Sequence, residues 1–426
     1  MKNLALNIYS FAFGKNTKRR MDYEDPMDID VDEKILKSSL EFNRIGNLFF
    51  NVDFLTKLPY ELSLIILNYL PASSLPSIAL SCHQGYELVK DNRLWENKFK
   101  ENEHWKLRLH PKQRYTIDWN YLYRNRFLLY KNWINNKHTV STIKGHEDSV
   151  YCIQFKDNLL VSGSRDQTIK FWNLSDRKCV RVMSGHTGSV LCFKFDNDIL
   201  VSGSSDMTVV VWEMKTGQIL HRLAHHTAGV LDVAIDDEFI VSCSKDNTVK
   251  VYERKSGKLL YSLNAHRAAV NALILKNKKI VTGSGDYAIK VWDVYTGQLL
   301  KELRGHSRGI ACVQFDGHTI VSGSNDQHIK VWNVHTGELI ASLKQHKELV
   351  RTLDFNDDFI ISGSYDQTII IWSRKTYKPI RIIENAHESW VFNIVIGQTK
   401  FISASQDKSI KIWNYEEGVD VKYFDN

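Results

Sequence analysis

The sequence predicts a mostly β fold in which residues 138–426 form a seven-bladed β-propeller, preceded by helices. Histidines recur seven times; five of the steps between them are 40 residues and the last is 41. Each is followed twenty residues later by an Asp and six residues after that by an aromatic residue. Short runs of alternating apolar and polar residues, bounded by turn residues, lie between these markers and are typical of strands. Four such strands in each copy, repeated with this period, are typical of propeller blades.

We expect the recurring markers to form a structural clip in every blade. In the first copy His146 precedes the first strand, Asp166 lies in the turn between the second and third strands, and Trp172 ends the third strand. A hydroxyl such as that of Ser162 can link the imidazole to the indole N–H, so that every buried polar group is paired. A Ser–His–Asp catalytic triad is the alternative, but seven copies of one nucleophile make no chemical sense. Tyr252 replaces Trp in the third copy and should alter that clip without abolishing it.

The markers of all seven copies follow one register. The histidines are His146, His186, His226, His266, His306, His346 and His387, and the acids are Asp166, Asp206, Asp246, Asp286, Asp326, Asp366 and Asp407. The aromatic residues are Trp172, Trp212, Tyr252, Trp292, Trp332, Trp372 and Trp413.

The seven repeats leave the propeller one outer strand short. Residues 139–143 or residues 419–424 can supply the missing strand. We expect the N-terminal segment to do so, because pairing the first and last elements of the chain closes the propeller.

Composition limits the class of protein. The net charge of +7 suits an anionic partner without requiring one. The six cysteines show no metal-ligand spacing, so we expect no metal or other cofactor and a reducing compartment, the cytoplasm or the nucleus. No apolar run has the length of a membrane-spanning helix, so no membrane contact is expected.

Residues 1–50 are predicted to form a largely disordered tail. A secretory signal is the less favoured interpretation of the weakly apolar start, which lacks a small-residue cleavage site. A basic run at residues 15–20 is followed by an acidic stretch at residues 22–33, and such separation of charge is typical of a disordered tail. A nuclear address in the basic run is the alternative.

From Phe54 onward the pattern becomes helical. Pro59 in a first helical turn, with Glu61 close behind it, favours the start of a helix that Pro71 ends. Helical spacing gives this helix one apolar face, made of Leu62, Ile65, Ile66, Tyr69 and Leu70. A second helix, capped by Ser73 or Ser74, turns Ile78, Ala79 and Cys82 inward, and a third carries Leu94, Trp95 and Phe99.

Three short helices bury little core on their own. Leu64, Leu67 and Leu75 are apolar side chains in addition to those that one buried helix face needs. We therefore expect residues 51–100 to present a surface that binds a partner. A small bundle packed on the propeller is the alternative. Helical signal continues through residues 101–137 and predicts a stiff helical linker.

The N-terminal helical run resembles an F-box, and the resemblance rests on Leu58, Pro59, Glu61, Leu62, Ile66, Leu70 and Trp95. An F-box followed by a helical connector and seven WD repeats resembles the substrate receptors of SCF-type ubiquitin ligases. Within this family, residues 53–414 are most similar to the beta-TrCP type, through loop segments such as residues 186–192 and 308–312. The resemblance implies that those seven residues bind a Skp-type adaptor, which joins cullin and RING subunits. It also implies that the propeller binds a phosphorylated degron and that the receptor is not an enzyme.

Propeller geometry brings the residue before each marker Asp, and those two to five positions after each His, to one rim of the central channel. Guanidinium groups beside hydroxyls suit phosphate oxygens, and two such pockets fit a doubly phosphorylated peptide. A chance scatter of basic residues is the alternative. The predicted degron-binding residues are Tyr151, Arg165, Ser189, Ser205, Leu231, Lys245, Asn271, Gly285, Arg308, Gly309, Leu349, Arg351 and Tyr365. The resemblance implies the same residue types at most of these positions, whereas Asn325 stands where the family has Ser.

Three other functions are weighed against a ligase receptor. Nucleic-acid binding is not expected, because base-stacking aromatics on the rim are few and four cations suit two phosphates better than a long backbone. A ligase-independent phosphopeptide-binding scaffold is the main alternative. An enzyme is disfavoured, because no acid–base or metal set occurs outside the repeated markers. Residues 33–50 are too short to assign as a dimerisation segment, so homodimer formation stays open.

Overall fold

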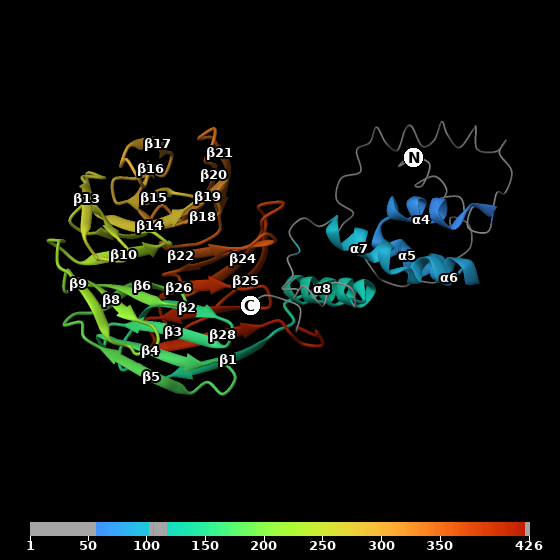
Figure 1. Ribbon diagram of the computed structural model, residues 1–426, viewed down its shortest axis with the longest axis horizontal. Helices are drawn as coiled ribbons and strands as arrows, with labels where there is room; N and C mark the ends of the chain where they lie inside the picture. Colours follow the sequence, from blue (N-terminus) through green and yellow to red (C-terminus); the bar gives the residue numbers. More distant parts are fainter. Residues whose placement is uncertain (1–56, 102–104, 106–116, 422–426) are drawn as a thin grey trace. The chain divides into compact units, whose positions relative to one another are not determined.

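The computed structural model describes residues 57–101, 105 and 117–421 (Figure 1). The predicted tail at residues 1–50 lies outside the described residues. The chain has two compact units, residues 1–128 and 129–426. The second unit contains seven four-stranded antiparallel sheets, which confirms the mostly β, seven-bladed propeller. The innermost strands neighbour one another in a closed ring.

The strands of each blade follow one another from the channel outward. The innermost strands are β2 (Val150–Lys156), β6 (Val190–Phe195), β10 (Val230–Ile235), β14 (Val270–Lys276), β18 (Ile310–Phe315), β22 (Val350–Phe355) and β26 (Val391–Ile396). The second strands are β3 (Leu159–Ser164), β7 (Ile199–Ser204), β11 (Phe239–Ser244), β15 (Lys279–Ser284), β19 (Thr319–Ser324), β23 (Phe359–Ser364) and β27 (Lys400–Ser405).

The two outer positions complete the sheets. The third strands are β4 (Thr168–Asn173), β8 (Val209–Glu213), β12 (Val249–Glu253), β16 (Ala288–Asp293), β20 (His328–Asn333), β24 (Ile369–Ser373) and β28 (Ser409–Asn414). The outermost strands are β5 (Cys179–Ser184), β9 (Ile219–Leu223), β13 (Leu259–Leu263), β17 (Leu299–Arg304), β21 (Leu339–Lys344), β25 (Pro379–Ile383) and, in the last blade, β1 (Thr139–Lys144).

The ring is closed by the strand that precedes the first repeat. β1 pairs antiparallel with β28, from Thr139 opposite Asn414 to Lys144 opposite Ser409. The prediction that the N-terminal segment closes the ring is therefore confirmed. The described residues of the alternative segment, 419–421, form no strand.

The core lies in the seams between blades. Val161 and Phe171 of one blade pack in the same cluster as Phe193 and Trp212 of the next. A glycine in the second strand permits this approach: a Cβ at Gly163 would lie 2.7 Å from both the Cys152 and Val190 side chains. The seam thus explains why small residues recur at this position, because the neighbouring blade leaves no room for a side chain.

The helical unit contains α4 (Tyr60–Asn68), the 3-10 turn η2 (Ala72–Ser74), α5 (Leu75–Ala79), α6 (His83–Lys90), α7 (Asn92–Lys100) and the first part of α8 (Trp119–Ile134). Pro59 caps α4, as expected. Helix α6 was not predicted, because Gly85 interrupts its pattern; there the Cys82 sulfur accepts a hydrogen bond from the Gly85 amide. Ser74 occupies the N-cap position of α5, as predicted, but its hydroxyl donates to the Pro71 carbonyl and makes no capping hydrogen bond to the helix.

The single apolar face predicted for the helix at α4 is divided between core and surface, and the additional leucines expected at a partner surface are buried. Leu64, Leu67 and Leu70 are buried, whereas Leu62, Ile65 and Tyr69 are 47%, 41% and 41% exposed. Apolar residues occur at so many positions of this helix that spacing alone does not distinguish its two faces.

Helix α8 occupies residues 119–134 of the predicted linker, and residues 106–116 lie outside the described part. At its start, the Asn92 side chain accepts a hydrogen bond from the Trp119 amide at 2.7 Å. At its end, within the propeller unit, Trp133 stacks on Tyr415 with ring centroids 4.0 Å apart and donates to the Gln398 carbonyl. None of the described helices is long and apolar enough to span a membrane.

Candidate binding rim and channel

The predicted clip is present in all seven blades. In the first, His146 Nδ1 lies 2.7 Å from Asp166 Oδ2, and Nε2 lies 2.7 Å from Ser162 Oγ. The Trp172 indole N–H donates to the same Oγ at 2.8 Å. The hydroxyl is therefore left to donate to Nε2, so Nδ1 carries the imidazole proton and donates to the carboxylate. Ser162 is fully buried, so it cannot meet a substrate as a catalytic nucleophile.

The charge state of the clips follows from their surroundings. Burial would raise the pKa of Asp166, but hydrogen bonds from His146 and Thr168 outweigh it and hold that pKa well below the usual range. Burial lowers the pKa of four clip histidines, although the partner carboxylates oppose this; they are His186, His226, His266 and His387. These imidazoles are neutral and the carboxylates ionised near pH 7.

The third blade has an altered clip. His226 keeps its partners Asp246 and Ser242, each at 2.8 Å. Tyr252 fills the place of the indole, and its buried hydroxyl lies near Ser242 but forms no hydrogen bond of good geometry. The prediction that this clip is altered and not abolished is confirmed.

Backbone hydrogen bonds join the two sets of predicted rim residues. In each blade the amide before the marker Asp donates to the carbonyl three positions after the marker His. The donor and acceptor pairs are Arg165 and Ser149, Ser205 and Ser189, Lys245 and Gly229, Gly285 and Ala269, Asn325 and Gly309, Tyr365 and Leu349, and Gln406 and Trp390, at 2.9 to 3.1 Å. These positions therefore lie together at one end of every blade, as the repeat predicts.

Two arginines surround Tyr151 on this rim. Burial raises the pKa of Tyr151, and the positive charges of Arg165 and Arg351 lower it. Arg165 is 58% exposed, and its Nε lies 3.7 Å from Asp148, a weak surface ion pair. Arg351 has one long contact, 3.5 Å from Nη1 to the Ala311 carbonyl. Neither guanidinium is therefore held by a strong carboxylate partner, and both can turn to an anion.

The remaining predicted rim residues are accessible to different degrees. Arg308, Lys245 and Ser205 are exposed, whereas Ser189, Leu231, Asn271, Gly285, Gly309, Leu349 and Tyr365 are half-buried. The Asn271 amide group donates to the Ile310 carbonyl at 2.7 Å, which ties it to the next blade. None of the thirteen predicted residues lies in the buried core.

An aromatic cluster beside the two arginines was missed. Trp390 stacks on Tyr365 with centroids 4.3 Å apart and planes 6° apart, and Phe392 lies 5.0 Å from Tyr151. Three rings of this cluster are accessible, those of Tyr151, Tyr365 and Trp390, and Phe392 is buried. The sequence places Trp390 on the rim, three residues after His387, but does not reveal its stack on Tyr365.

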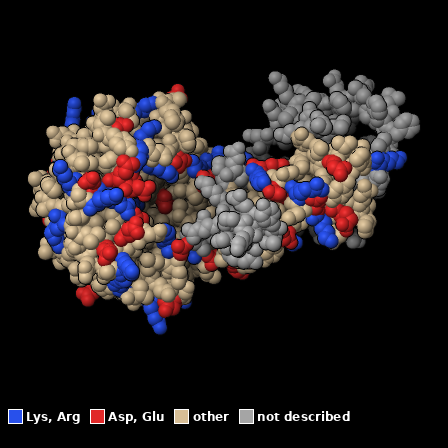
Figure 2. All heavy atoms as spheres, viewed as in Figure 1, with Lys and Arg blue, Asp and Glu red and all other residues tan. Residues whose placement is uncertain are grey.

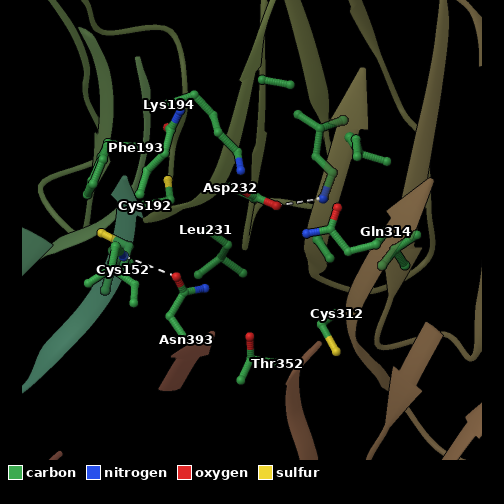
Figure 3. A pocket seen from close by; sticks show the side chains of 18 of the residues that line it. Cys152, Cys192, Phe193, Lys194, Leu231, Asp232, Cys312, Gln314, Thr352 and Asn393 are labelled. Carbon is green, nitrogen blue, oxygen red and sulfur yellow. Dashed lines mark hydrogen bonds between the residues drawn. The ribbon is translucent and has the colours of Figure 1, made fainter. Parts of the chain in front are cut away.

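A channel cavity of about 460 Å³ lies along the innermost strands, lined in part by Tyr151, Leu231, Asn271 and Arg351. Figure 3 shows Lys194, Asp232, Gln314 and Asn393 among its lining side chains. Two of these groups, Asp232 and Asn393, connect neighbouring blades, as does Asp354 on the innermost strand β22. Asp232 Oδ2 accepts from the Leu273 amide at 2.9 Å, Asn393 Oδ1 from the Ile153 amide at 3.0 Å, and Asp354 Oδ2 from the Ile396 amide at 3.0 Å.

Charges on the propeller are mixed. Figure 2 shows Lys and Arg interspersed with Asp and Glu on the visible face, so that face offers no continuous basic track to a nucleic-acid backbone. Among the described residues, no group of three or more His, Cys, Asp or Glu side chains is placed to hold a metal ion.

The predicted adaptor-binding residues are divided between surface and core. Pro59, Glu61 and Leu62 are exposed, and Leu58 and Ile66 are half-buried. Leu70 and Trp95 are buried, and the Trp95 indole N–H donates to the Val89 carbonyl at 2.6 Å. These last two residues pack in the core of the helical unit, so the structure does not present them to an adaptor as it does Pro59, Glu61 and Leu62. Leu80, 89% exposed, is an apolar surface residue that no sequence pattern indicated.

Models of two protein families match the chain. The F-box-like family matches residues 55–101. The family described as WD domain, G-beta repeat matches seven segments that together exceed half of the chain, at residues 137–173, 177–213, 217–253, 257–293, 297–333, 337–373 and 377–414.

Curated relatives share parts of the chain. An F-box protein of Saccharomyces cerevisiae is 32% identical over 156 residues, 30% of this chain and 24% of that protein. "Probable E3 ubiquitin ligase complex SCF subunit scon-2" of Neurospora crassa is 44% identical over 66 residues, 16% of this chain and 10% of that protein. "F-box/WD repeat-containing protein 7" of Drosophila melanogaster is 31% identical over 177 residues, 38% of this chain and 12% of that protein. The matched parts thus span no more than about a quarter of these relatives.

A solved structure supports the propeller. The crystal structure of a computationally designed protein, Ika8, matches with a TM-score of 0.56 and 35% sequence identity. The match covers 63% of this chain and 85% of the designed one. A match of this extent is in keeping with the propeller described above.

Proposed function

Because the chain belongs to the WD40 repeat family and its N-terminal helical region contains an F-box, we propose that it is the substrate-recognition subunit of an SCF-type E3 ubiquitin ligase. The observation that carries the proposal is the presence of both parts in one chain, as in relatives named as F-box proteins and SCF subunits. In this role the chain does no chemistry and needs no cofactor. It holds a substrate near the ubiquitin-transfer machinery and so raises the local concentration of the substrate's lysines.

The surface of α4 supports binding of a Skp-type adaptor, and through it of cullin and RING subunits. Leu64 and Leu67 are buried and pack α4 against its own unit. On the same helix and just after it, three apolar residues remain exposed: Leu62, Ile65 and Tyr69. A helix that is apolar on both faces is expected where one face packs in the core and the other binds a partner.

The rim supports binding of a phosphorylated degron, in the manner of beta-TrCP-type receptors. Burial raises the pKa of Tyr151 whereas the charges of Arg165 and Arg351 both lower it, and guanidinium groups near a hydroxyl suit the oxygens of one phosphate. Lys245 and Arg308 are exposed on other blades of the same rim and supply charge for a second phosphate.

The test uses the full-length chain, tagged and purified from cells that contain a Skp-type adaptor. We expect the adaptor to co-purify and a doubly phosphorylated peptide to bind in fluorescence anisotropy. Arg165→Ala and Arg351→Ala should each weaken peptide binding at least about tenfold, as expected for loss of a charged hydrogen bond worth about 1.5–3 kcal/mol. Arg177→Ala is the matched control, because Arg177 is exposed in the β4–β5 loop at the other end of its blade.

The two outcomes separate the alternatives. Unchanged peptide affinity in both arginine variants contradicts the degron site. If the wild-type chain binds the phosphopeptide but no adaptor, the result supports the alternative function, a ligase-independent phosphopeptide-binding scaffold. Both functions place the protein in the cytoplasm or the nucleus, in keeping with six cysteines that are all free thiols.

A further inference from the structure

The aromatic cluster on the rim joins residues of three blades around a buried ring, Phe392. Trp390 enters β26, Tyr365 lies between β23 and β24, and their rings are nearly parallel at 4.3 Å. Phe392 lies edge-on to both, with ring centroids 6.0 Å from Tyr365 and 6.4 Å from Trp390. Tyr151 of the first blade contacts the same Phe392 ring at 5.0 Å.

Trp390 is held in place and remains open to solvent. Its carbonyl accepts the Gln406 amide at 3.0 Å, and the neighbouring Ser389 hydroxyl donates to the Gln406 side chain at 2.7 Å. The residue is nevertheless 40% exposed. Tyr365 covers one side of the indole, so the exposed part presents aromatic surface at the channel mouth. Exposed, rigidly held tryptophans of this kind are typical of binding hot spots.

The aromatic cluster adjoins the proposed phosphate pocket. Tyr151, whose pKa is raised by burial and lowered by the charges of Arg165 and Arg351, lies 5.0 Å from Phe392 between ring centroids. Phe392 in turn contacts both Tyr365 and Trp390. A peptide whose phosphate occupies this pocket therefore passes beside Trp390. The two guanidinium charges repel a lysine or arginine of the peptide, although such a side chain could otherwise stack on an indole. A neutral aromatic side chain meets no such penalty and gains ring stacking.

We propose, building on the degron-binding function, that Trp390 is a specificity-determining residue that stacks on a neutral aromatic side chain close to the phosphorylated residue of the degron. The substrate class is thus a phosphopeptide with a nearby Phe, Tyr or Trp. The Tyr365 ring stacks on the indole and holds it in this position.

The test measures binding of doubly phosphorylated peptides to the full-length chain by fluorescence anisotropy. Each position flanking a phosphoserine is occupied in turn by Phe, Leu, Lys or Ala. At one position Phe should bind about fivefold more tightly than Ala, the size expected of an aromatic pair, and Lys should bind more weakly than Ala. Trp390→Ala and Trp390→Leu should abolish the preference for Phe, and Trp390→Phe should retain it.

Val180→Ala is the matched control, because Val180 is 61% exposed on the outermost strand β5 and should not affect the preference. Melting curves confirm that each variant is folded. If wild-type protein binds the phosphopeptides with no preference for Phe at any position, or if Trp390→Leu keeps the preference, the inference is wrong and the degron-binding function stands. If no phosphopeptide binds the wild type at all, the degron-binding function itself is wrong, and the inference falls with it.

Discussion

At the scale of single residues, the Tyr252 hydroxyl stands apart from the other polar groups of the seven clips. In the described structure, every other polar side-chain group of the clips has a well-formed hydrogen bond, whereas this hydroxyl is buried near Ser242 without one. Its ring still packs within the core cluster between two blades. Burial without a partner costs free energy, because the group gives up its hydrogen bonds to water.

Replacing Tyr252 with Phe should therefore stabilise the propeller. Loss of an unsatisfied buried hydroxyl is expected to raise the free energy of unfolding by about 1 kcal/mol, measured by urea denaturation. Trp212→Phe is the matched control; it deletes an indole N–H that donates to Ser202 at 2.8 Å and should destabilise the protein. A Tyr252→Phe variant less stable than the wild type would show that the hydroxyl does have a partner.

The clip residues were predictable because each copy repeats the same types at the same spacing, and the contacts lie within one blade. Contacts between blades were not predictable in this way. The stack of Trp390 on Tyr365 joins two copies, and its existence depends on how the blades pack. Leu70 and Trp95 show the same limit, since their apolar character fits a partner surface and a core equally well.

At the scale of elements, the innermost strands have backbone amides whose hydrogen-bond partners the sequence does not reveal. Each faces the channel and leaves backbone amides at its edge without a partner in its own sheet. Side chains of the preceding blade accept some of these amides; Asp354 does so for Ile396, and Thr352 for Ile394. Polar residues on channel-lining strands therefore join blades. Their alternation predicted strands correctly, but their hydrogen-bond partners required the structure.

This arrangement gives Asp354 a distinctive effect on stability. Burial raises the pKa of Asp354 to about 6, above the ordinary value of 3.8. The folded protein thus keeps a proton that the unfolded chain releases, so the stabilisation from this group is complete below about pH 4 and declines as the pH rises to about 6. Allowing for solvent in the channel, the decline should be about 2 kcal/mol.

Asp354→Asn should remove that decline. The variant's free energy of unfolding, relative to that of the wild type, should rise by about 2 kcal/mol between pH 4 and pH 6, as measured by urea denaturation across this range. Asp237→Asn, which changes an exposed carboxylate in the β10–β11 loop, should leave the pH dependence as it is in the wild type. A constant difference between Asp354→Asn and wild type at every pH contradicts the raised pKa.

At the scale of the propeller as a whole, the blades form a closed ring through one pair of strands. Most neighbouring blades are also joined through the chain that runs from one to the next, but the first and last are far apart in sequence. The count of repeats and the missing outer strand predicted this closure, because a ring with an open edge leaves unpaired backbone groups. The position of the F-box helices along the chain was equally predictable. Their buried and exposed faces were not, since both faces of α4 are apolar.

Deleting β1 should therefore destabilise the whole propeller. A chain beginning at Gly145 leaves the edge of β28 open and removes Ile143, which packs in one cluster with Ile410 and Ile412. We expect the melting temperature to fall by at least about 10 °C, because each lost kcal/mol lowers it by roughly 2–4 °C in a domain of this size. A chain beginning at Asp118 keeps α8 and β1 and serves as the matched control, with a melting temperature within a few degrees of the full-length propeller transition. Equal melting temperatures for the two truncated chains would show that the ring does not depend on this strand.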